Sequence, residues 1–314
     1  MEFPKLHNQL ILAPMEEVTG LPFRMLCRRY GASLAYAEMA SSHGIARDNP
    51  STLRLITTCK EDKPVGIQLC GQLPGILLKA AQKTQKDFDI IDINMGCPSQ
   101  NIIKQGAGSA LLKRKSKIRE IIETLTKNLS KPVTAKIRLG FSKVEVLELA
   151  EIIEKAGASA IAIHARTAIG KSSGKADWDL IKQVKKQSSI PIIGNGGVFS
   201  PLDAESLLKC CDYVMIARAA IRNPKIFHEI LYYFETGKIK STEPEEKIET
   251  FFEYCKLNAK YPYGRFKILK QRAQDFTHGL KHSAPLREKI SHVKTEEALL
   301  EIMQMYKKQV ALKS

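Results

Sequence analysis

Short apolar segments alternate with charged, helix-like segments from residue 8 to about residue 220. The apolar segments are rich in β-branched residues, which is typical of strands buried on both faces of a parallel sheet. The pattern predicts eight strands: Leu10–Ala13, Leu34–Met39, Val65–Leu69, Ile90–Asn94, Val133–Ile137, Ala160–His164, Ile192–Gly194 and Tyr213–Ala217.

The segments between the strands have the period of amphipathic helices. Lys117–Leu129 places three isoleucines and a leucine on one face, and Val144–Lys155 follows the same spacing. Pro201–Leu208 follows Ser200, which is a suitable N-cap for a helix with proline at its first position.

Eight strands that alternate with helices predict an α/β fold, a (β/α)₈ TIM barrel. The alternative is a doubly wound sheet, which usually has fewer strands and a glycine-rich phosphate loop after the first one. Here the first strand ends in Ala-Pro-Met, and the glycine pair Gly196-Gly197 follows the seventh strand. The late position of this pair favours the barrel.

The pattern changes to helices without strand-like segments from about residue 240. We therefore predict a barrel over residues 1–240 and a small all-helical C-terminal domain over residues 241–314. Within the second domain, residues 258–289 combine interleaved aromatic residues with a basic excess that can bind phosphates. The alternative is an ordinary helix with an aromatic core face and solvated lysines. The basic side chains are Lys260, Arg265, Lys267, Lys270, Arg272, Lys281, Arg287 and Lys289.

The charge of the whole chain points in the same direction. The 314 residues include 49 basic and 33 acidic side chains, which gives a net charge of +16. A chain this basic favours a polyanionic partner, of which nucleic acid is the usual one, over the alternative of a general lysine bias.

Composition also limits the class of protein. No apolar run is long enough to span a membrane, and the N-terminal residues lack the features of a secretory signal. The seven cysteines form neither a C-x-x-C pair nor a cluster at zinc spacing, which predicts reduced thiols and no metal site. We expect a cytoplasmic protein without a membrane partner, and a monomer.

The ends of the predicted strands carry the candidate chemistry, because the active sites of TIM barrels lie at the carboxyl ends of the strands. Polar or basic residues follow nearly every apolar strand, which a purely structural rim would not need. The strand ends contribute Pro14, Met15, Glu38, Gln68, Asn94, Cys97, Lys136, Arg138, His164, Arg166, Asn195, Gly196, Gly197, Ala217 and Arg218.

The loops after the seventh and eighth strands predict a phosphate site. Gly196 and Gly197 allow the backbone to approach a ligand closely, and the N–H groups there can hold an anion. Arg218 can add a charge-assisted hydrogen bond. The position fits the usual phosphate site of this fold, although a glycine pair after a strand is by itself a weak signal.

Lys136 ends the fifth strand and is expected to point into the barrel mouth. In a flavin site, a positive charge at this position stabilises the anionic reduced ring. Gln68 and His164 can hydrogen-bond the ring edge or the phosphate. Taken alone, Lys136 is better explained as a salt-bridged lysine and His164 as a core histidine, but the eight strand ends together favour a site.

Cys97 follows the fourth strand in Asn94-Met95-Gly96-Cys97-Pro98. Gly96 permits a sharp turn and Pro98 stops the strand, so the thiol is presented on a loop. No Cys/His pair is evident that would make it an acylating nucleophile, and proton transfer is the simpler role.

At this point the chain resembles the tRNA-dihydrouridine synthases along about residues 8–230, and more weakly through the tail. The strings that carry the resemblance are LAPMEEVTGLPFR, VGIQLCG, DINMGCPSQ, KQGAGSALL, VTAKIRLG, IHART, SGKADW, IIGNGGV and MIARAA, in the order and spacing of the family. The most specific element is N-x-G-C-P followed by G-A-G-S-A-L-L.

The resemblance implies FMN at the barrel mouth, held by Pro14, Met15, Gln68, Lys136, His164, Asn195, Gly196, Gly197, Ala217 and Arg218. NADPH would reduce the flavin, whose N5 would pass a hydride to C6 of a tRNA uridine while Cys97 protonates C5. Asn94 would position the uracil, Arg166 would contact the uracil or the RNA backbone, and the helical domain would bind the tRNA. Glu16 stands where the family has a small residue, so only a backbone contact is expected there.

Two other functions remain open from the sequence. The first is an FMN barrel that acts on a free pyrimidine, such as a dihydroorotate dehydrogenase. The G-A-G-S-A-L-L string and the basic tail argue against it. The second is a barrel without catalytic activity that only binds RNA, which would lack flavin.

Overall fold

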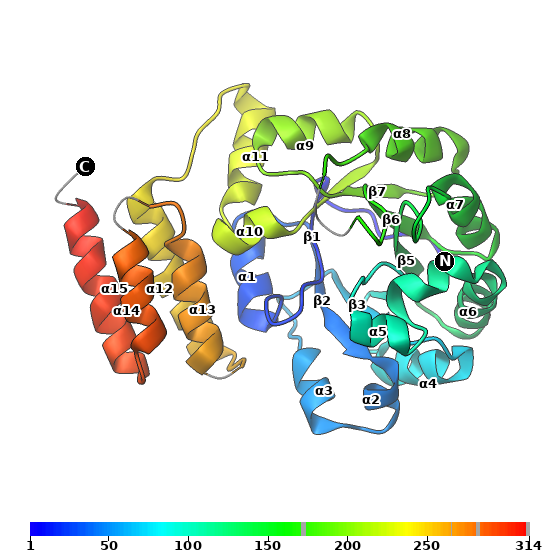
Figure 1. Ribbon diagram of the computed structural model, residues 1–314, viewed down its shortest axis with the longest axis horizontal. Coiled ribbons are helices and arrows are strands. Elements are labelled where there is room, and N and C mark those ends of the chain that lie inside the picture. Colours follow the sequence, from blue (N-terminus) through cyan, green and yellow to red (C-terminus); the bar gives the residue numbers. More distant parts are fainter. Residues whose placement is uncertain (171–173, 265, 281–282, 312–314) are drawn as a thin grey trace.

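The computed structural model describes residues 1–170, 174–264, 266–280 and 283–311. Its centre is a closed barrel of parallel strands in the order β1 to β8 (Figure 1). The predicted (β/α)₈ barrel is thereby confirmed, and every predicted strand end lies within two residues of the observed one. The strands are β1 Leu10–Leu12, β2 Leu34–Ser41, β3 Val65–Cys70, β4 Ile90–Asn94, β5 Val133–Arg138, β6 Ala160–His164, β7 Ile192–Asn195 and β8 Tyr213–Ile216.

Helices surround the barrel and cover its outer face. The predicted apolar face of α6 is buried, and Ser200 caps α9 by accepting a hydrogen bond from the backbone N–H of Asp203. The elements are α1 Leu21–Arg29, α2 Ser42–Ala46, α3 Pro50–Leu55, α4 Pro74–Thr84, α5 Gln100–Lys104, the 3₁₀ helix η1 Gly108–Lys113, α6 Lys115–Asn128, α7 Val146–Lys155, α8 Trp178–Gln187, α9 Pro201–Leu208, α10 Arg218–Arg222 and α11 Ile226–Thr236.

Side chains alternate between the inside of the barrel and the helical layer, because strands have a period of two. In β4, Ile90 belongs to a small apolar cluster that includes residues of most other strands, whereas Ile91 and Ile93 join the large core beneath the helices. The same alternation turns Asp92 and Asn94 toward the interior. Apolar residues therefore fill one end of the barrel, and polar residues occupy the carboxyl end.

The C-terminal part is a bundle of helices beside the barrel, next to α1 and α10 (Figure 1). It contains α12 Pro244–Lys260, α13 Phe266–Phe276, α14 Ser283–His292 and α15 Glu296–Ala311. α12 begins with a capping box of Glu243 and Glu246, and its Tyr254 packs edge-on against Phe276 with ring centroids 6.4 Å apart. The predicted boundary after residue 240 lies in the connection between α11 and α12.

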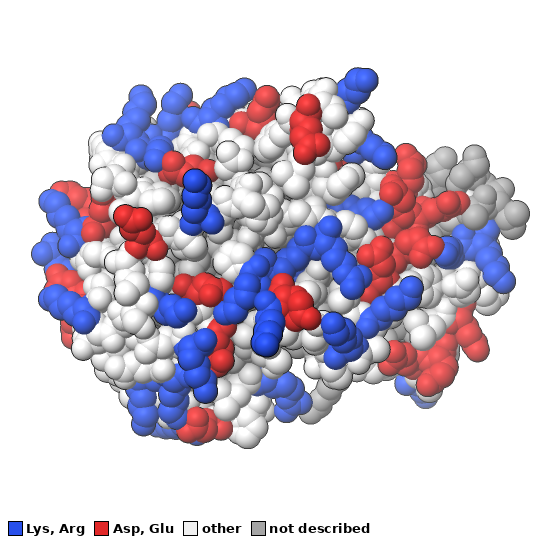
Figure 2. Space-filling model, turned by 180° about the vertical axis from the view of Figure 1, so that it is seen from behind, with Lys and Arg blue, Asp and Glu red and all other residues white. Residues whose placement is uncertain are grey.

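The surface mixes both signs of charge. In the view of Figure 2, Lys and Arg side chains gather in a run across the middle of the face, and acidic side chains are interspersed elsewhere. No helix in the described part of the chain is long and apolar enough to cross a membrane.

Candidate active site

A chain of hydrogen bonds joins three strands below the loop that carries Cys97. Asp92 accepts from Gln68 Nε2 at 2.7 Å, and Gln68 Oε1 accepts from Asn94 Nδ2 at 2.8 Å. Asn94 Oδ1 in turn accepts the backbone N–H of Cys97 at 2.9 Å. Thr134 also donates to Asp92, at 2.6 Å. A single buried carboxylate is thus connected to the turn of the Cys97 loop.

The charge of Asp92 determines which atoms donate and which accept along this series of hydrogen bonds. An ionised carboxylate only accepts hydrogen bonds, so Gln68 must turn its NH₂ group toward Asp92 and its oxygen toward Asn94. Asn94 must then use its own oxygen for the Cys97 loop. Burial raises the pKa of Asp92 to about 6, while Thr134 and Gln68 lower it. The carboxylate is therefore mostly ionised at neutral pH.

The loop around Cys97 is held from two further sides. Arg138, the last residue of β5, donates from Nε to the carbonyl of Gly96 at 2.8 Å. The carbonyl of Cys97 accepts the backbone N–H of Ser109 at 3.0 Å. The Cys97 residue itself is only partly buried. The thiol is therefore carried by a fixed backbone at the mouth of the barrel.

Lys136 lies inside the barrel mouth, where Nζ donates to Asn195 Oδ1 at 3.1 Å. Asn195 Nδ2 donates to the carbonyl of Met215, which orients this amide as well. Burial and the nearby charge of Arg138 lower the pKa of Lys136 to about 8, against Asp92 and Cys97, which raise it. A half-buried cation with this balance of charges is stabilised by an electron-rich or anionic ligand.

His164, at the end of β6, lies in a strongly positive environment. Burial, together with the positive charges of Lys136, Arg138, Arg166 and Arg218, lowers its pKa to about 2. The imidazole is therefore neutral at physiological pH and can donate or accept one hydrogen bond at each nitrogen. Four cationic side chains around one neutral histidine form a site for an anion.

A cavity of about 370 Å³ opens next to this cationic group, beside the loops that follow β1, β7 and β8. Gly196 and Gly197 contribute their backbone to its wall, with φ values of 101° and 89° that side chains rarely adopt. A Cβ atom on Gly196 would lie 2.4 Å from Cδ2 of His164. The indole N–H of Trp178 donates to the carbonyl of Gly196 at 2.9 Å and fixes the turn.

The structure brings most of the predicted site residues together, in two groups. Lys136 connects them, because it pairs with Asn94 across β4 and β5 and binds Asn195. The Cys97 group contains Gln68, Asn94 and Cys97. The cavity is lined by Met15, His164, Asn195, Gly196, Gly197, Ala217 and Arg218.

Two predicted residues have other neighbours. Pro14 precedes the cavity residue Met15 but does not line the cavity itself. Arg166 does not line the cavity either: it donates twice to the carbonyl of Gly174, at 3.0 and 2.7 Å, while its Nη1 lies 3.4 Å from Nε2 of His164. Its assigned contact with the substrate stays a prediction.

Sequence reasoning missed Asp92 and Trp178 as parts of the site. Asp92 lies two positions before Asn94 in the string DINMGCP, so the strand period places both on the same face. Trp178 ends the string SGKADW. The strand period could have identified Asp92, but the hydrogen bond of Trp178 to a distant loop has no sequence signal.

The basic segment of the bundle is only partly exposed. Phe276 and Tyr263 are buried, and Arg272 is 2% exposed and lies 3.2 Å from Asp275. The interpretation of these three as nucleic-acid contacts is wrong, because their side chains form the core and the barrel contact. Lys260, Lys267 and Lys289 remain exposed, whereas Arg265 and Lys281 lie outside the described residues.

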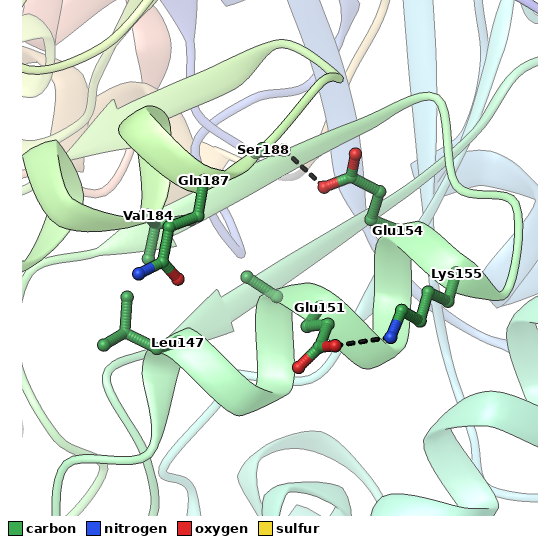
Figure 3. A pocket seen from close by; sticks show the side chains of 8 residues that line it. Leu147, Glu151, Glu154, Lys155, Val184, Gln187 and Ser188 are labelled. Atoms are coloured by element: carbon green, nitrogen blue, oxygen red, sulfur yellow. Dashed lines mark hydrogen bonds and ion pairs between the residues drawn. The ribbon is translucent and has the colours of Figure 1, made fainter.

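A second hollow, of about 410 Å³, lies on the outside of the barrel between α7 and α8 (Figure 3). Its charged residues are paired: Glu151 bonds Lys155, and Glu154 accepts from Ser188 at 2.7 Å. Among the residues that the structure describes, no group of three metal-ligating side chains exists there or elsewhere. The cavity at the barrel mouth is therefore the better candidate for chemistry.

Comparison with known proteins agrees with this geometry. The model of the dihydrouridine synthase family matches residues 11–311. The chain belongs to the dihydrouridine synthase family. The match includes the barrel, the Cys97 loop and the helical bundle.

Individual relatives match most of the chain. The tRNA-dihydrouridine synthase B of Shewanella oneidensis is 38% identical over 273 residues, which are 85% of this chain and 84% of that protein. The tRNA-dihydrouridine synthase B of Proteus vulgaris is 35% identical over 312 residues and 96% of both chains. Among solved structures, the old yellow enzyme homologue from Zymomonas mobilis aligns with a TM-score of 0.56 at 13% identity, over 77% of this dihydrouridine synthase and 92% of that chain. The last likeness supports the barrel fold.

Proposed function

We propose that this dihydrouridine synthase reduces uridines of tRNA to 5,6-dihydrouridine, with FMN as its cofactor and NADPH as its reductant. The observation that carries the proposal is the cationic group around His164 beside the Gly196-Gly197 turn. Lys136, Arg138 and Arg218 lower the pKa of His164 together, and the glycine turn exposes backbone to the same cavity. A phosphorylated, electron-accepting ligand matches both features.

The residues of the site fit FMN in chemical terms. Arg218 and the backbone of the glycine turn would hold its phosphate. Lys136 would lie near the ring, where its positive charge favours the reduced form. Gln68 and His164 would provide hydrogen bonds. When bound and reduced by NADPH, FMN supplies the hydride for C6 of the uracil ring.

Cys97 would complete the reaction by giving a proton to C5. Addition of hydride to C6 and of a proton to C5 saturates the C5–C6 bond, so the thiol is left as a thiolate that solvent reprotonates. Arg138 donates to the carbonyl of Gly96 at 2.8 Å and so helps to hold the loop that carries the thiol. The hydrogen-bond chain from Asp92 keeps the backbone of Cys97 in place during the transfer.

A uridine must leave the RNA stack to reach this site. The C5–C6 bond is covered by neighbouring bases within stacked RNA, so the enzyme has to extrude the base into the barrel mouth. The exposed lysines of the helical bundle would bind the phosphates on either side. The reaction therefore needs both parts of the chain.

The proposal is tested with purified protein, FMN, NADPH and tRNA from a strain that lacks this gene. Dihydrouridine mapping by primer extension or mass spectrometry is expected to show new sites that depend on NADPH. Oxidation of dihydroorotate by the same preparation is expected to be absent. A colourless protein that cannot be reconstituted with FMN would instead support a barrel that only binds RNA.

A further inference from the structure

The loop between β1 and α1, residues 13–20, lies between the cavity and the helical bundle. Met15, Glu16 and Val18 line the cavity. Glu17, in the same turn, faces the bundle: its carboxylate lies 3.4 Å from Lys267, and its carbonyl lies 3.5 Å from Nη2 of Arg272. One short loop is therefore shared by the two parts of the molecule, on the side where Figure 1 shows α1 next to the bundle.

Glu38, a residue of the barrel, connects this loop to the bundle. It lies near the end of β2 and is 1% exposed. Its Oε2 accepts the backbone N–H of Glu17 at 2.8 Å, and its Oε1 accepts the hydroxyl of Tyr263. Tyr263 belongs to the connection between α12 and α13 and is buried. One barrel carboxylate thus bonds the cavity loop with one oxygen and the bundle with the other.

Two backbone features show how closely this contact is fitted. Glu17 has a φ of 54°, which is strained for a residue with a side chain, and its N–H bond to Glu38 stabilises that conformation. Gly20 faces the ring of Tyr263 so closely that a Cβ atom there would lie 2.5 Å from three ring carbons. The ring therefore occupies the space that a side chain at residue 20 would need.

We infer that Glu38 and Tyr263 are positioning residues, which fix the helical bundle against the β1–α1 loop and so set where a bound tRNA presents its uridine to the cavity. The inference rests on the proposed function for its substrate. The contact itself can be tested without any substrate.

The first test measures hydrogen–deuterium exchange of the β1–α1 loop by mass spectrometry. Tyr263→Phe removes only the hydroxyl that Glu38 accepts. We expect faster exchange of the loop that contains Glu17, because Glu38 loses the partner that holds it. Tyr261→Phe is the control, since its buried hydroxyl has no hydrogen bond to the barrel among the described residues. Unchanged exchange in Tyr263→Phe would overturn the inference.

The second test separates positioning from binding and from stability. For Tyr263→Phe we expect the dissociation constant for tRNA and the rate of flavin reduction by NADPH to stay close to those of the wild type. The single-turnover rate of dihydrouridine formation at saturating tRNA is expected to fall about tenfold or more, because a small misplacement of reacting groups is costly. A single-turnover rate of Tyr263→Phe equal to that of the wild type would contradict the inference.

A steric variant tests the same contact independently. Gly20→Ala keeps Glu38 and the hydroxyl of Tyr263 but displaces the ring, and Gly20 has a φ of −60° that alanine adopts without strain. Gly20→Ala should reproduce the slow single-turnover rate. In a double variant with Tyr263→Ala, Gly20→Ala should cause no further decrease of that rate, because the ring is already absent. If the wild type forms no dihydrouridine, the proposed function fails, and the exchange experiment still decides the contact.

Discussion

The two amides behind Cys97 face the way they do because Asp92 can only accept hydrogen bonds while it is ionised. Gln68 donates to Asp92 and therefore accepts from Asn94 with its oxygen. Asn94 in turn accepts the N–H of Cys97 with its own oxygen. A buried carboxylate can in this way determine the backbone geometry at Cys97, the proposed acid. The sequence string DINMGCP thus contains both the proposed proton donor and the residue that orders its loop.

Replacement of Cys97 by alanine tests the role of the thiol. Cys97→Ala is expected to keep FMN and to accept hydride from NADPH at the wild-type rate, because the cavity and Lys136 are unchanged. Dihydrouridine formation should fall by at least about a hundredfold, the usual contribution of a general acid. Stopped-flow absorbance measures the first step and RNA mass spectrometry the second. Full dihydrouridine yield would refute the acid role.

Glu38 predicts a pH dependence of stability. Burial raises its pKa from 4.5 to about 7, although the N–H of Glu17 and the charge of Arg24 lower it. The folded state then binds the proton more tightly than the unfolded state, so the free energy of unfolding falls as pH rises from about 4.5 to about 7. Glu38→Gln has no titrating carboxyl and does not lose this stability. The expected difference in unfolding free energy above the folded-state pKa is ~3 kcal/mol, from ~1.4 kcal/mol per unit of pKa shift.

Urea unfolding at several pH values checks this prediction. The difference in unfolding free energy between Glu38→Gln and the wild type should grow from pH 5 to pH 8 in favour of the variant. A difference that is constant over this range would mean that Glu38 does not titrate there.

Among the elements, the turn after β7 leaves no room for a side chain at Gly196. A Cβ atom on Gly196 would overlap His164, and its φ of 101° disfavours any side chain. Gly196→Ala is therefore expected to weaken FMN binding by at least about tenfold, because both the backbone approach and the histidine are disturbed. Fluorescence titration of apoprotein with FMN measures the change.

Gly75→Ala is the matched control for that substitution. Gly75 lies in the first turn of α4, and a Cβ atom there would meet nothing within 4 Å. The affinity for FMN should stay at the wild-type value. Equal weakening by both variants would indicate a general effect of glycine replacement and not a role of the turn.

The elements also show what a sequence can predict. The strands were predictable because β-branched runs such as Ile90–Ile93 have few stable alternatives to a buried parallel sheet. The cavity residues followed from the strand ends. The bundle was harder, because helical periodicity does not say which face docks on the barrel. Arg272 and Phe276 are therefore buried where the composition of the segment suggested a surface.

At the level of the whole molecule, net charge and exposed lysines predict a salt-dependent interaction with tRNA. Lys267→Ala with Lys289→Ala should lower the affinity and reduce the slope of log affinity against log salt by about two, because each lysine neutralises about one phosphate. Arg272 is not suitable for this experiment, because it is buried beside Asp275. Filter binding at several salt concentrations gives the slope.

The control pair for the salt experiment carries the same charge on the outside of the barrel. Lys127 and Lys155 are exposed and pair with Glu123 and Glu151 of their own helices, as Lys267 pairs with Glu17. Their replacement by alanine should leave the slope unchanged. A slope that responds equally to both pairs would show that only net charge matters and that the bundle has no particular part in binding.

The β1–α1 loop has a practical consequence for exchanging parts between related enzymes. A chimera that receives residues 241–314 from a relative acquires a new partner for Gly20 and Glu38, while the receiving loop keeps the shape made for Tyr263. Such a graft is expected to fold and to bind RNA, yet to modify it poorly. Transplanting residues 13–20 and position 38 together with the helices should restore the match, so the natural unit of exchange is discontinuous in sequence.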